Sequence, residues 1–437
     1  MSEDGIKVYI GNAIHCNKPF SVSVLEKSFI AVKKTKIIAI GDVSSLEQFK
    51  REHEKCVIDE VVLNEYQILI PGLIDTHNHA GQYANLGLGL NQPLYEWLET
   101  HTFALEEKLA DLDLARKCFD VVVRQTLNHG TTTVAYNSIV DTDASLILAD
   151  IVIARGQRAF VGKVNITAKC VESLRESADA TIDDTKRFIS VMMNKNNTLV
   201  QPIISPSHPF RMSIDTLKEL TSLAKTHSLR IQTHLCECEG EPEEAHKVYN
   251  KSLGEILVES GLLTDKTIIA HAVHLTSKEI QELAKHKTSV AHCPGSNFNL
   301  LSGVCDVKTL FKAGIDVGLG TDISAGSNVG ITDQMRNALI ASSTIYFNDK
   351  NRKLIDCYDA FYMATLGGAK ALSIDEIVGN FEVGKDFDAL IVDMNVKNGN
   401  STCLFSYEPL ELLQKFIYLG DDRNIISVFV AGRNVKC

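Results

Sequence analysis

The fold is set by residues 68–79, which read Ile68-Leu69-Ile70-Pro71-Gly72-Leu73-Ile74-Asp75-Thr76-His77-Asn78-His79. This apolar run, rich in Ile and Leu, is typical of a buried strand in a parallel sheet that is covered on both faces. In an extended segment, residues i and i+2 point to the same side, so we expect His77 and His79 to leave the strand end together. Two converging imidazoles form half of a zinc site. The alternative is a pair of histidines in a surface loop.

The composition describes a large chain with an acidic balance of charge. Its 437 residues, 45% of them hydrophobic, can bury a large core, and one domain with a small appendage fits this length. The formal net charge of −11 argues against a nucleic-acid or anionic-membrane partner, because both need basic patches. No apolar run reaches the roughly 18 residues that a membrane span needs, so no span is expected.

The N-terminal residues and the cysteines indicate a cytoplasmic protein. The first seven residues are acidic and lack an apolar core, so no secretory signal is expected. The 11 cysteines are scattered through the chain, and we expect them to be small, mostly buried hydrophobic residues in a reducing compartment. Cys236 and Cys238 are too close together for a Cys-x-x-Cys redox or zinc pair.

Two patterns divide the chain. Residues 1–67 and 376–437 contain short β-rich pieces and turns, and we expect them to form one small β-sandwich domain built from both chain ends. Residues 68–375 alternate apolar runs with helical patterns, which predicts a (β/α)8 TIM-like barrel; a doubly wound open sheet is the alternative. The runs expected as barrel strands are residues 69–77, 131–136, 158–164, 199–205, 230–234, 267–271, 289–292 and 315–322.

Several of these runs end in residues that can bind metal. In a (β/α)8 barrel, the catalytic groups lie at the carboxyl ends of the strands. A single histidine at a strand end is more often structural, but a group of such residues in register with the strand count indicates one shared site. The residues at these ends are His77, His79, His234, His271 and Asp322.

The candidate ligands favour one metal ion. Two-metal sites need a bridging anion, often a modified lysine at the fourth strand end, and the fourth run offers no lysine. Lys163, on the third run, is interpreted as a structural or rim residue. Histidine and carboxylate ligands with one open position suit one Zn²⁺ per chain, with Fe²⁺ as the alternative. The expected ligands are His77, His79, His234 and Asp322.

Glu237 follows His234 by three residues and is expected to act in catalysis. Zinc lowers the pKa of a bound water to about 7, which supplies a nucleophile without a serine or cysteine. A carboxylate beside that water can accept its proton as a general base and deliver it elsewhere as a general acid. His271 and Asp322 would orient the water and accept its proton. The alternative is that Glu237 caps the following helix.

The chain also resembles a known family over nearly its whole length. It is similar to the amidohydrolase superfamily and, within its aminohydrolase branch, to the guanine deaminases. The first and last of the matching motifs mark the superfamily, whereas those around Gln82, Trp97 and Gln157 look specifically like guanine deaminases. The motifs are residues 71–79, 82–83, 95–99, 130–133, 156–164, 232–237, 271–275, 292–297 and 318–322.

This resemblance implies a reaction and further site residues. It implies hydrolytic removal of a ring amino group, such as guanine and water giving xanthine and ammonia, with Glu237 protonating the ring nitrogen beside the attacked carbon. Gln82 would pair with the purine edge, although a plain loop amide is the alternative. Trp97 would wall the pocket, unless it belongs to the core. The resemblance also implies a homodimer.

The chain departs from the guanine deaminase pattern after the fourth run. Where that family usually has Pro-Arg-Phe, this sequence reads Pro206-Ser207-His208-Pro209-Phe210-Arg211. A hydroxyl and an imidazole replace a bidentate cationic donor, which changes the substrate edge that can be recognised. We therefore assign substrate binding to Ser207, His208, Phe210 and Arg211, and expect weak guanine turnover unless Arg211 reaches the pocket.

The leading hypothesis is thus a zinc aminohydrolase acting on a guanine-like heterocyclic amine. Related ring amines, such as 8-oxoguanine, pterins or triazines, are alternative substrates. An amide or ring-bond hydrolase is a second reading, although Glu237 and the single-metal ligands weigh against it. A non-catalytic scaffold is a third, but such chains typically lose ligands that this one keeps.

Overall fold

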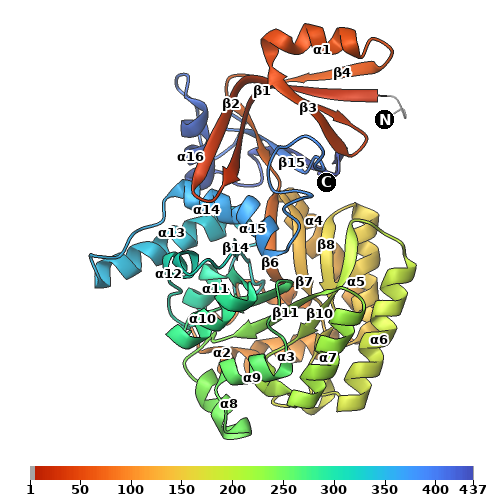
Figure 1. The fold of residues 1–437 in the computed structure, drawn as a ribbon, viewed down its shortest axis with the longest axis vertical. Coiled ribbons are helices and arrows are strands. Elements are labelled where there is room, and N and C mark those ends of the chain that lie inside the picture. The colour runs from red at the N-terminus through yellow and green to blue at the C-terminus, as the bar shows by residue number, and fades with distance from the viewer. Residues whose placement is uncertain (1–4, 437) are drawn as a thin grey trace.

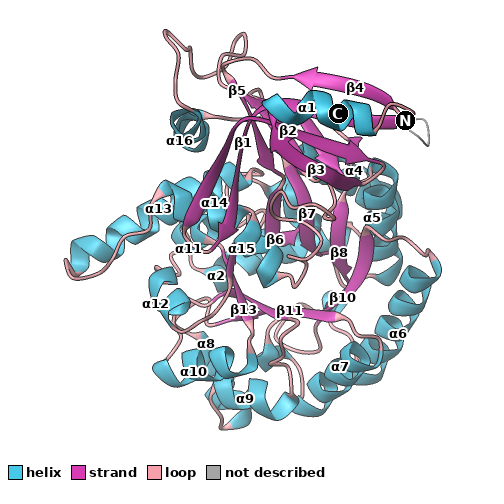
Figure 2. Ribbon diagram, turned by 45° about the horizontal axis from the view of Figure 1, so that its top comes forward, coloured by secondary structure: helices cyan, strands magenta, loops and turns pink. Residues whose placement is uncertain are grey.

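The computed structural model describes residues 5–436, which form a parallel barrel with a smaller sheet at one end of it (Figure 1). The barrel occupies the lower part of Figure 1, and the small sheet lies above it. The same arrangement is seen from a second direction in Figure 2. No helix among the described residues is long and apolar enough to cross a membrane.

The barrel strands follow one another in sequence order, as a (β/α)8 barrel requires and a doubly wound sheet does not. The order is β6, β7, β8, β10, β11, β12, β13 and β14, with the short strand β9 beside β10. The two edge strands meet where the amide of Asp322 donates to the carbonyl of His77 at 2.9 Å. The strands are β6 Leu73–His79, β7 Thr131–Asn137, β8 Arg158–Gly162, β9 Val164–Asn165, β10 Val200–Pro206, β11 Arg230–Leu235, β12 Thr267–His271, β13 Ser289–His292 and β14 Val317–Leu319.

Helices surround the barrel on its outer face (Figure 2). Their starts follow the local sequence: Ser252 and Thr276 each cap a helix and receive a glutamate three residues later, which satisfies the free N–H groups of the first turn. The outer helices are α4 Leu112–Asn128, α5 Thr142–Arg155, α6 Ala178–Asn194, α7 Ile214–Thr226, α8 Glu241–Tyr249, α9 Leu253–Ser260, α10 Ser277–His286, α11 Pro294–Asn299, α12 Val307–Lys312, α13 Ile331–Asn348, α14 Cys357–Ala364 and α15 Leu366–Ala371.

The second sheet is built from both chain ends, which confirms that expectation. Its strand order is β17-β16-β15-β5-β1-β2-β3, with β4 beside β1, and helices α1 (Leu46–Glu52) and α16 (Pro409–Leu419) accompany it. Strands β4 and β5 run parallel to β1, so the sheet is mixed. The strands are β1 Gly5–Lys18, β2 Ser21–Lys33, β3 Lys36–Asp42, β4 Val57–Val62, β5 Gln67–Pro71, β15 Ala389–Asp393, β16 Ile425–Val430 and β17 Arg433–Asn434.

The run predicted as one strand over residues 69–77 is two strands in two sheets. Strand β5 pairs with β1 and β15 in the small sheet, whereas β6 begins the barrel. Gly72 lies between them, and a Cβ at this position would lie 2.7 Å from the Cβ of Thr132, so only glycine lets the chain pass this closely. Because residues 68–74 are apolar throughout, the sequence pattern does not reveal the change from one sheet to the other. The division into residues 1–67 with 376–437 and 68–375 stays a prediction; strand β5, which spans its first boundary, pairs within the small sheet.

The small sheet covers the amino ends of the barrel strands. The amide of Gly72, which precedes β6, donates to the carbonyl of Asp388 at 2.9 Å. Arg158, the first residue of β8, binds Asp388 at 3.0 Å and Asp386 at 2.9 Å, and its side chain is almost fully buried. The carboxyl ends of the same strands are therefore free to build a site away from the small sheet.

Candidate active site

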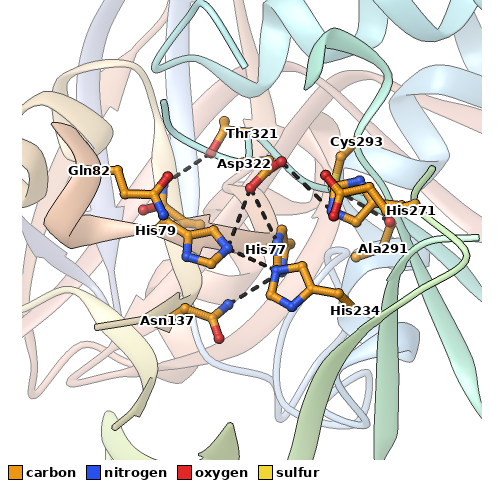
Figure 3. Close-up of polar contacts among 12 residues, drawn as sticks. His77, His79, Gln82, Asn137, His234, His271, Ala291, Cys293, Thr321 and Asp322 are labelled. Carbon is orange, nitrogen blue, oxygen red and sulfur yellow. Dashed lines mark hydrogen bonds and ion pairs between the residues drawn. The ribbon is translucent and has the colours of Figure 1, made fainter. Parts of the chain in front are cut away.

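Three imidazoles meet at the carboxyl ends of β6 and β11 (Figure 3). His77 and His79 lie within the last three residues of β6, and His234 is the penultimate residue of β11. The Nε2 atoms of His79 and His234 are 3.0 Å apart, and one ring nitrogen of each of the three lies within 4.8 Å of the others. Strands far apart in the sequence thus deliver these side chains to one point.

Asp322 completes this cluster from beyond β14. Its Oδ1 lies 3.3 Å from Nε2 of His77 and 3.5 Å from Nε2 of His79. The backbone of Asp322 is left-handed, with φ of 49°, a conformation that is uncommon for residues other than glycine and is often found at functional sites. It turns the chain out of the strand direction, so that the carboxylate faces the histidines (Figure 3).

The donor atoms of this cluster fit a metal ion. Nδ1 of His234 donates to the carbonyl of Ser207 at 2.9 Å, which leaves the lone pair on its Nε2 free. Nε2 of His77 is buried and has no hydrogen-bond partner among residues 5–436. Burial holds the pKa of His79 at about 3 and that of His234 well below its usual value, so both rings are neutral. Neutral imidazoles beside a carboxylate are the donors that one divalent ion requires.

Glu237 and His271 adjoin the same carboxylate. Nε2 of His271 lies 3.5 Å from Oε2 of Glu237 and 3.8 Å from Oδ2 of Asp322. Burial raises the pKa of Glu237 well above its usual value, and the charge of Asp322 raises it further. Helix α8 begins at Glu241 with Gly240 as its N-cap residue, so Glu237 does not cap that helix. The carboxyl of Glu237 is placed to hold and transfer a proton.

Sequence reasoning missed the residues that orient these histidines. Nδ2 of Asn137 lies 3.4 Å from Nδ1 of His77, and Oδ1 of Asn297 lies 3.0 Å from Nδ1 of His271. Asn137 is the last residue of the second barrel strand, so its place at a strand end was the available signal. Asn297 lies inside helix α11 and carried no such signal.

Asp75 connects the first and last barrel strands beneath the cluster. Its Oδ1 accepts hydrogen bonds from the amides of Thr321 at 3.0 Å and His77 at 3.2 Å, and its Oδ2 accepts from Asn78 at 3.0 Å and from the Thr321 hydroxyl. The carboxyl is fully buried, which raises its pKa to about 6. One carboxylate therefore holds the backbone on both sides of the barrel closure, next to Asp322.

A cavity adjoins the cluster and receives most of the predicted substrate-binding residues. Gln82, Trp97, Ser207, His208 and Arg211 line it together with His79, His234, Glu237, His271 and Asp322. Trp97 is buried and its indole donates to the carbonyl of Leu88 at 3.1 Å, so it is both cavity wall and core. Phe210 lies outside the lining of this cavity and faces a neighbouring hollow instead, because the short helix η5 (Pro209–Arg211) directs it there.

His208 and Arg211 are both buried in this wall. The ring of His208 stacks on that of His234, with centroids 4.6 Å apart, and its Nε2 lies 3.4 Å from Oε2 of Glu237. Burial, together with the charge of Arg211, holds the pKa of His208 well below its usual value. Arg211 is 4% exposed, and its Nε has no hydrogen-bond partner among the described residues. The condition set for guanine turnover, that Arg211 reaches the cavity, is met.

Lys163 has no place in the metal cluster. Its ammonium forms a buried ion pair with Glu176, with 2.6 Å between the charged atoms. This contact agrees with its interpretation as a structural residue.

The ten cysteines among residues 5–436 are all free.

A barrel with histidines and an aspartate at the carboxyl ends of its strands defines the class of metal-binding (β/α)8 enzymes. The chain belongs to the amidohydrolase family, whose model matches residues 68–435. The guanine deaminase of Dictyostelium discoideum is 37% identical over 99% of this chain and 98% of its own length. Human guanine deaminase is also 37% identical, over 98% of this chain and 96% of its own length.

Comparison with solved structures gives the same result. The guanine deaminase of C. acetobutylicum, solved with guanine bound in its active site, superposes with a TM-score of 0.91 and is 32% identical. The match covers 98% of this chain and 100% of the other. Sequence and structure therefore agree on the family.

Proposed function

We propose that this protein is a guanine deaminase that converts guanine and water to xanthine and ammonia. The observation that carries this proposal is that one cavity is lined by a histidine–aspartate cluster, by Glu237, and by Arg211 and Gln82. The similarity to guanine deaminases over nearly the full chain supports guanine as the substrate. The reaction breaks a C–N bond of a cyclic amidine by hydrolysis.

One Zn²⁺ per chain would be held by His77, His79, His234 and Asp322, whose donor atoms are neutral nitrogens and a carboxylate. When bound, zinc supplies a water whose pKa is lowered to about 7. Fe²⁺ suits the same donors and is the alternative metal.

The chain's own residues would move the protons. Attack of water at the ring carbon that bears the amino group puts negative charge on the adjacent ring nitrogen, and Glu237 would deliver a proton there. Glu237 would take that proton from the attacking water. His271, whose Nε2 lies 3.5 Å from Glu237 and 3.8 Å from Asp322, would orient the water together with Asp322. The second proton of the attacking water would pass to the amino group, which then leaves as ammonia while the hydroxyl oxygen becomes the new ring carbonyl. The neutral ring of His208, whose Nε2 lies 3.4 Å from Oε2 of Glu237, would cover the Glu237 carboxyl.

The substrate would be recognised by a cation and an amide on the cavity wall. A buried guanidinium without a hydrogen bond to Nε is costly unless a ligand pairs with it. The carbonyl oxygen of guanine is such an acceptor. Arg211 would thus replace the arginine that the Ser207-His208 stretch lacks. Gln82, which lies three residues beyond His79, would pair with the ring edge beside that carbonyl.

The direct test is a comparison of wild type with Glu237→Gln. We expect wild type to release equimolar xanthine and ammonia from guanine, measured by ultraviolet absorbance and an ammonia assay. Glu237→Gln removes the proton carrier and should lower kcat by about 10²–10⁴-fold at unchanged metal content. Glu239→Gln, an exposed change two residues away, is the matched control and should leave kcat unchanged.

A metal-loaded protein that releases no ammonia from guanine would contradict the proposal. The same assay should then be run with 8-oxoguanine, isoguanine, pterins and adenine derivatives, because the altered Ser207-His208 stretch could favour a related ring amine. Elemental analysis of the purified protein tests for one zinc per chain.

We further propose that the protein is cytoplasmic and homodimeric. The free cysteines among residues 5–436 support a reducing compartment. Large apolar side chains on helices α13 and α16, Ile340, Phe347 and Tyr418, are more than half exposed, which supports a covered face in solution. Sedimentation analysis would give a mass of one chain if the dimer were absent.

A further inference from the structure

Glu106 is a carboxyl group in the cavity wall that the proposed reaction does not use. It lies on helix α3 (Phe103–Lys108) and lines the same cavity as Arg211 and Gln82. Its Oε1 accepts a hydrogen bond of 3.1 Å from Nε2 of Gln82. Among residues 5–436, this is the one side-chain hydrogen bond that Gln82 makes. Burial disfavours the charged form of this carboxyl and raises the pKa of Glu106 to about 7.

This contact fixes which way the Gln82 amide faces. A carboxylate oxygen only accepts hydrogen bonds, whereas the end of a glutamine carries one acceptor and one double donor. When Glu106 is ionised, the NH₂ group of Gln82 therefore faces it, as in the 3.1 Å contact, and Oε1 of Gln82 is left to accept a hydrogen bond from a ligand. A glutamine without such a neighbour can turn its amide over and present either group.

The orientation matters because related purines differ at the ring nitrogen beside the carbonyl. In guanine, this nitrogen carries a hydrogen and donates. In 2,6-diaminopurine, which bears the same 2-amino group, the corresponding nitrogen has no hydrogen and accepts. An amide oxygen held toward it would pair with guanine and repel the diamino ring. A site with a fixed acceptor can thus discriminate strongly between the two.

We infer that Glu106 is a positioning residue that fixes the Gln82 amide with its oxygen toward the substrate, and thereby selects 6-oxo over 6-amino purines. The inference rests on the proposed function and deepens it, because it assigns the choice of substrate to a residue outside the reacting centre. In this arrangement Arg211 donates a hydrogen bond to the carbonyl oxygen of guanine. Glu106 does not contact the substrate and acts through Gln82.

The test compares kcat and KM for guanine and 2,6-diaminopurine in wild type, Glu106→Gln and Glu106→Asp. At pH 8 the carboxylate is the main form, because its pKa is about 7. Glu106→Gln replaces a group that only accepts with an amide that can present either a donor or an acceptor to Gln82, so the Gln82 amide is no longer fixed. We expect KM for guanine to rise about tenfold, with kcat little changed. The preference for guanine should fall about tenfold or more. Glu106→Asp keeps an acceptor and should recover much of the preference.

Controls separate this role from structure and from the reaction itself. Glu96→Gln is a matched change of an exposed glutamate on the neighbouring helix α2 (Leu94–Trp97) and should leave both constants unchanged. If 2,6-diaminopurine is not turned over, its inhibition constant against guanine gives the same ratio. An unchanged preference in Glu106→Gln, or a loss confined to kcat, would overturn the inference.

A measurement on wild type alone covers the case in which Glu106→Gln does not fold. 1-Methylguanine lacks the hydrogen that the oxygen of Gln82 would accept, so its KM should be raised at least tenfold over that of guanine. Equal KM values would overturn the inference. Failure of wild type to deaminate guanine at all would instead contradict the proposed function, so the two failures are distinguishable.

Discussion

At the residue scale, Arg211 stands out because its charge is buried without an ion pair. Among residues 5–436, no carboxylate lies within 4.0 Å of its guanidinium, and 4% of the residue is exposed. Burial lowers its pKa from the usual value. Burying such a charge weakens the fold unless it serves another purpose. A residue that lowers the stability of the fold and lies in a ligand cavity is typically a binding residue.

This argument predicts opposite effects on stability and activity. Arg211→Met keeps the volume but removes the charge, so the melting temperature should stay the same or rise. The value of kcat/KM for guanine should fall by about 10²-fold or more, because the carbonyl loses its charged donor. Thermal unfolding and steady-state kinetics measure the two effects. Arg116→Met, an exposed change on α4, is the control, and normal guanine kinetics in Arg211→Met would show that Arg211 does not read the substrate.

The sequence predicted some of these residues and missed others for a physical reason. His234 and His271 stand at the ends of apolar runs, so the strand pattern itself points to them. Glu106 and Asn297 stand inside helices among other polar residues, where their spacing has no signature. Their importance comes from the three-dimensional neighbours Gln82 and His271. Only tertiary structure supplies that information.

At the scale of elements, the barrel closes through a side chain as well as through its backbone. Strands β6 and β14 are the two ends of the hydrogen-bonded order, and Asp75 connects them by accepting from Thr321 and His77. Most barrel runs were predictable, because buried parallel strands are rich in apolar residues. The break at Gly72 was not, because β5 and β6 are both apolar and differ only in the sheet that they join.

We predict that Asp75→Asn loosens this closure. Both carboxylate oxygens of Asp75 now accept hydrogen bonds. In Asp75→Asn, an NH₂ group replaces one of these oxygens and faces another donor, so at least one hydrogen bond is lost. The free energy of unfolding should fall by about 2–4 kcal/mol, as for other buried charged acceptors. Denaturant unfolding measures this, and elemental analysis should show less bound metal. Asp113→Asn, an exposed change in the first turn of α4, should alter neither; equal stability of the two variants would refute the role.

At the scale of the whole molecule, a buried ion-pair cluster fastens the small sheet to the barrel. Arg158 begins β8, and its partners Asp386 and Asp388 precede β15. All three belong to the end of the barrel that carries the small sheet, opposite the candidate active site. The cluster therefore contributes to the assembly of the two sheets rather than to the chemistry.

Removal of this arginine should destabilise the protein without changing its chemistry. Arg158→Met leaves the buried carboxylate of Asp388 without its ion pair, whereas Asp386 keeps its pair with Lys36 at 2.9 Å. The loss should cost about 3–5 kcal/mol of unfolding free energy. At a temperature where the variant is folded, kcat for guanine should match wild type. Arg187→Met breaks an exposed ion pair with Asp143 and should cost at most about 1 kcal/mol. A reduced kcat in folded Arg158→Met would mean that the small sheet takes part in catalysis.

The pairing of β5 with β15 has a consequence for how the chain is made. Gln67 at the start of β5 binds Asp393 at the end of β15, and 326 positions separate them. At the usual speed of translation, roughly 5–20 residues per second, β5 leaves the ribosome some tens of seconds before its neighbour exists. During that time an apolar strand edge is open to wrong partners. The nascent polypeptide is thus exposed to aggregation for the whole interval between the synthesis of β5 and that of β15, and chaperone binding is most useful during that interval.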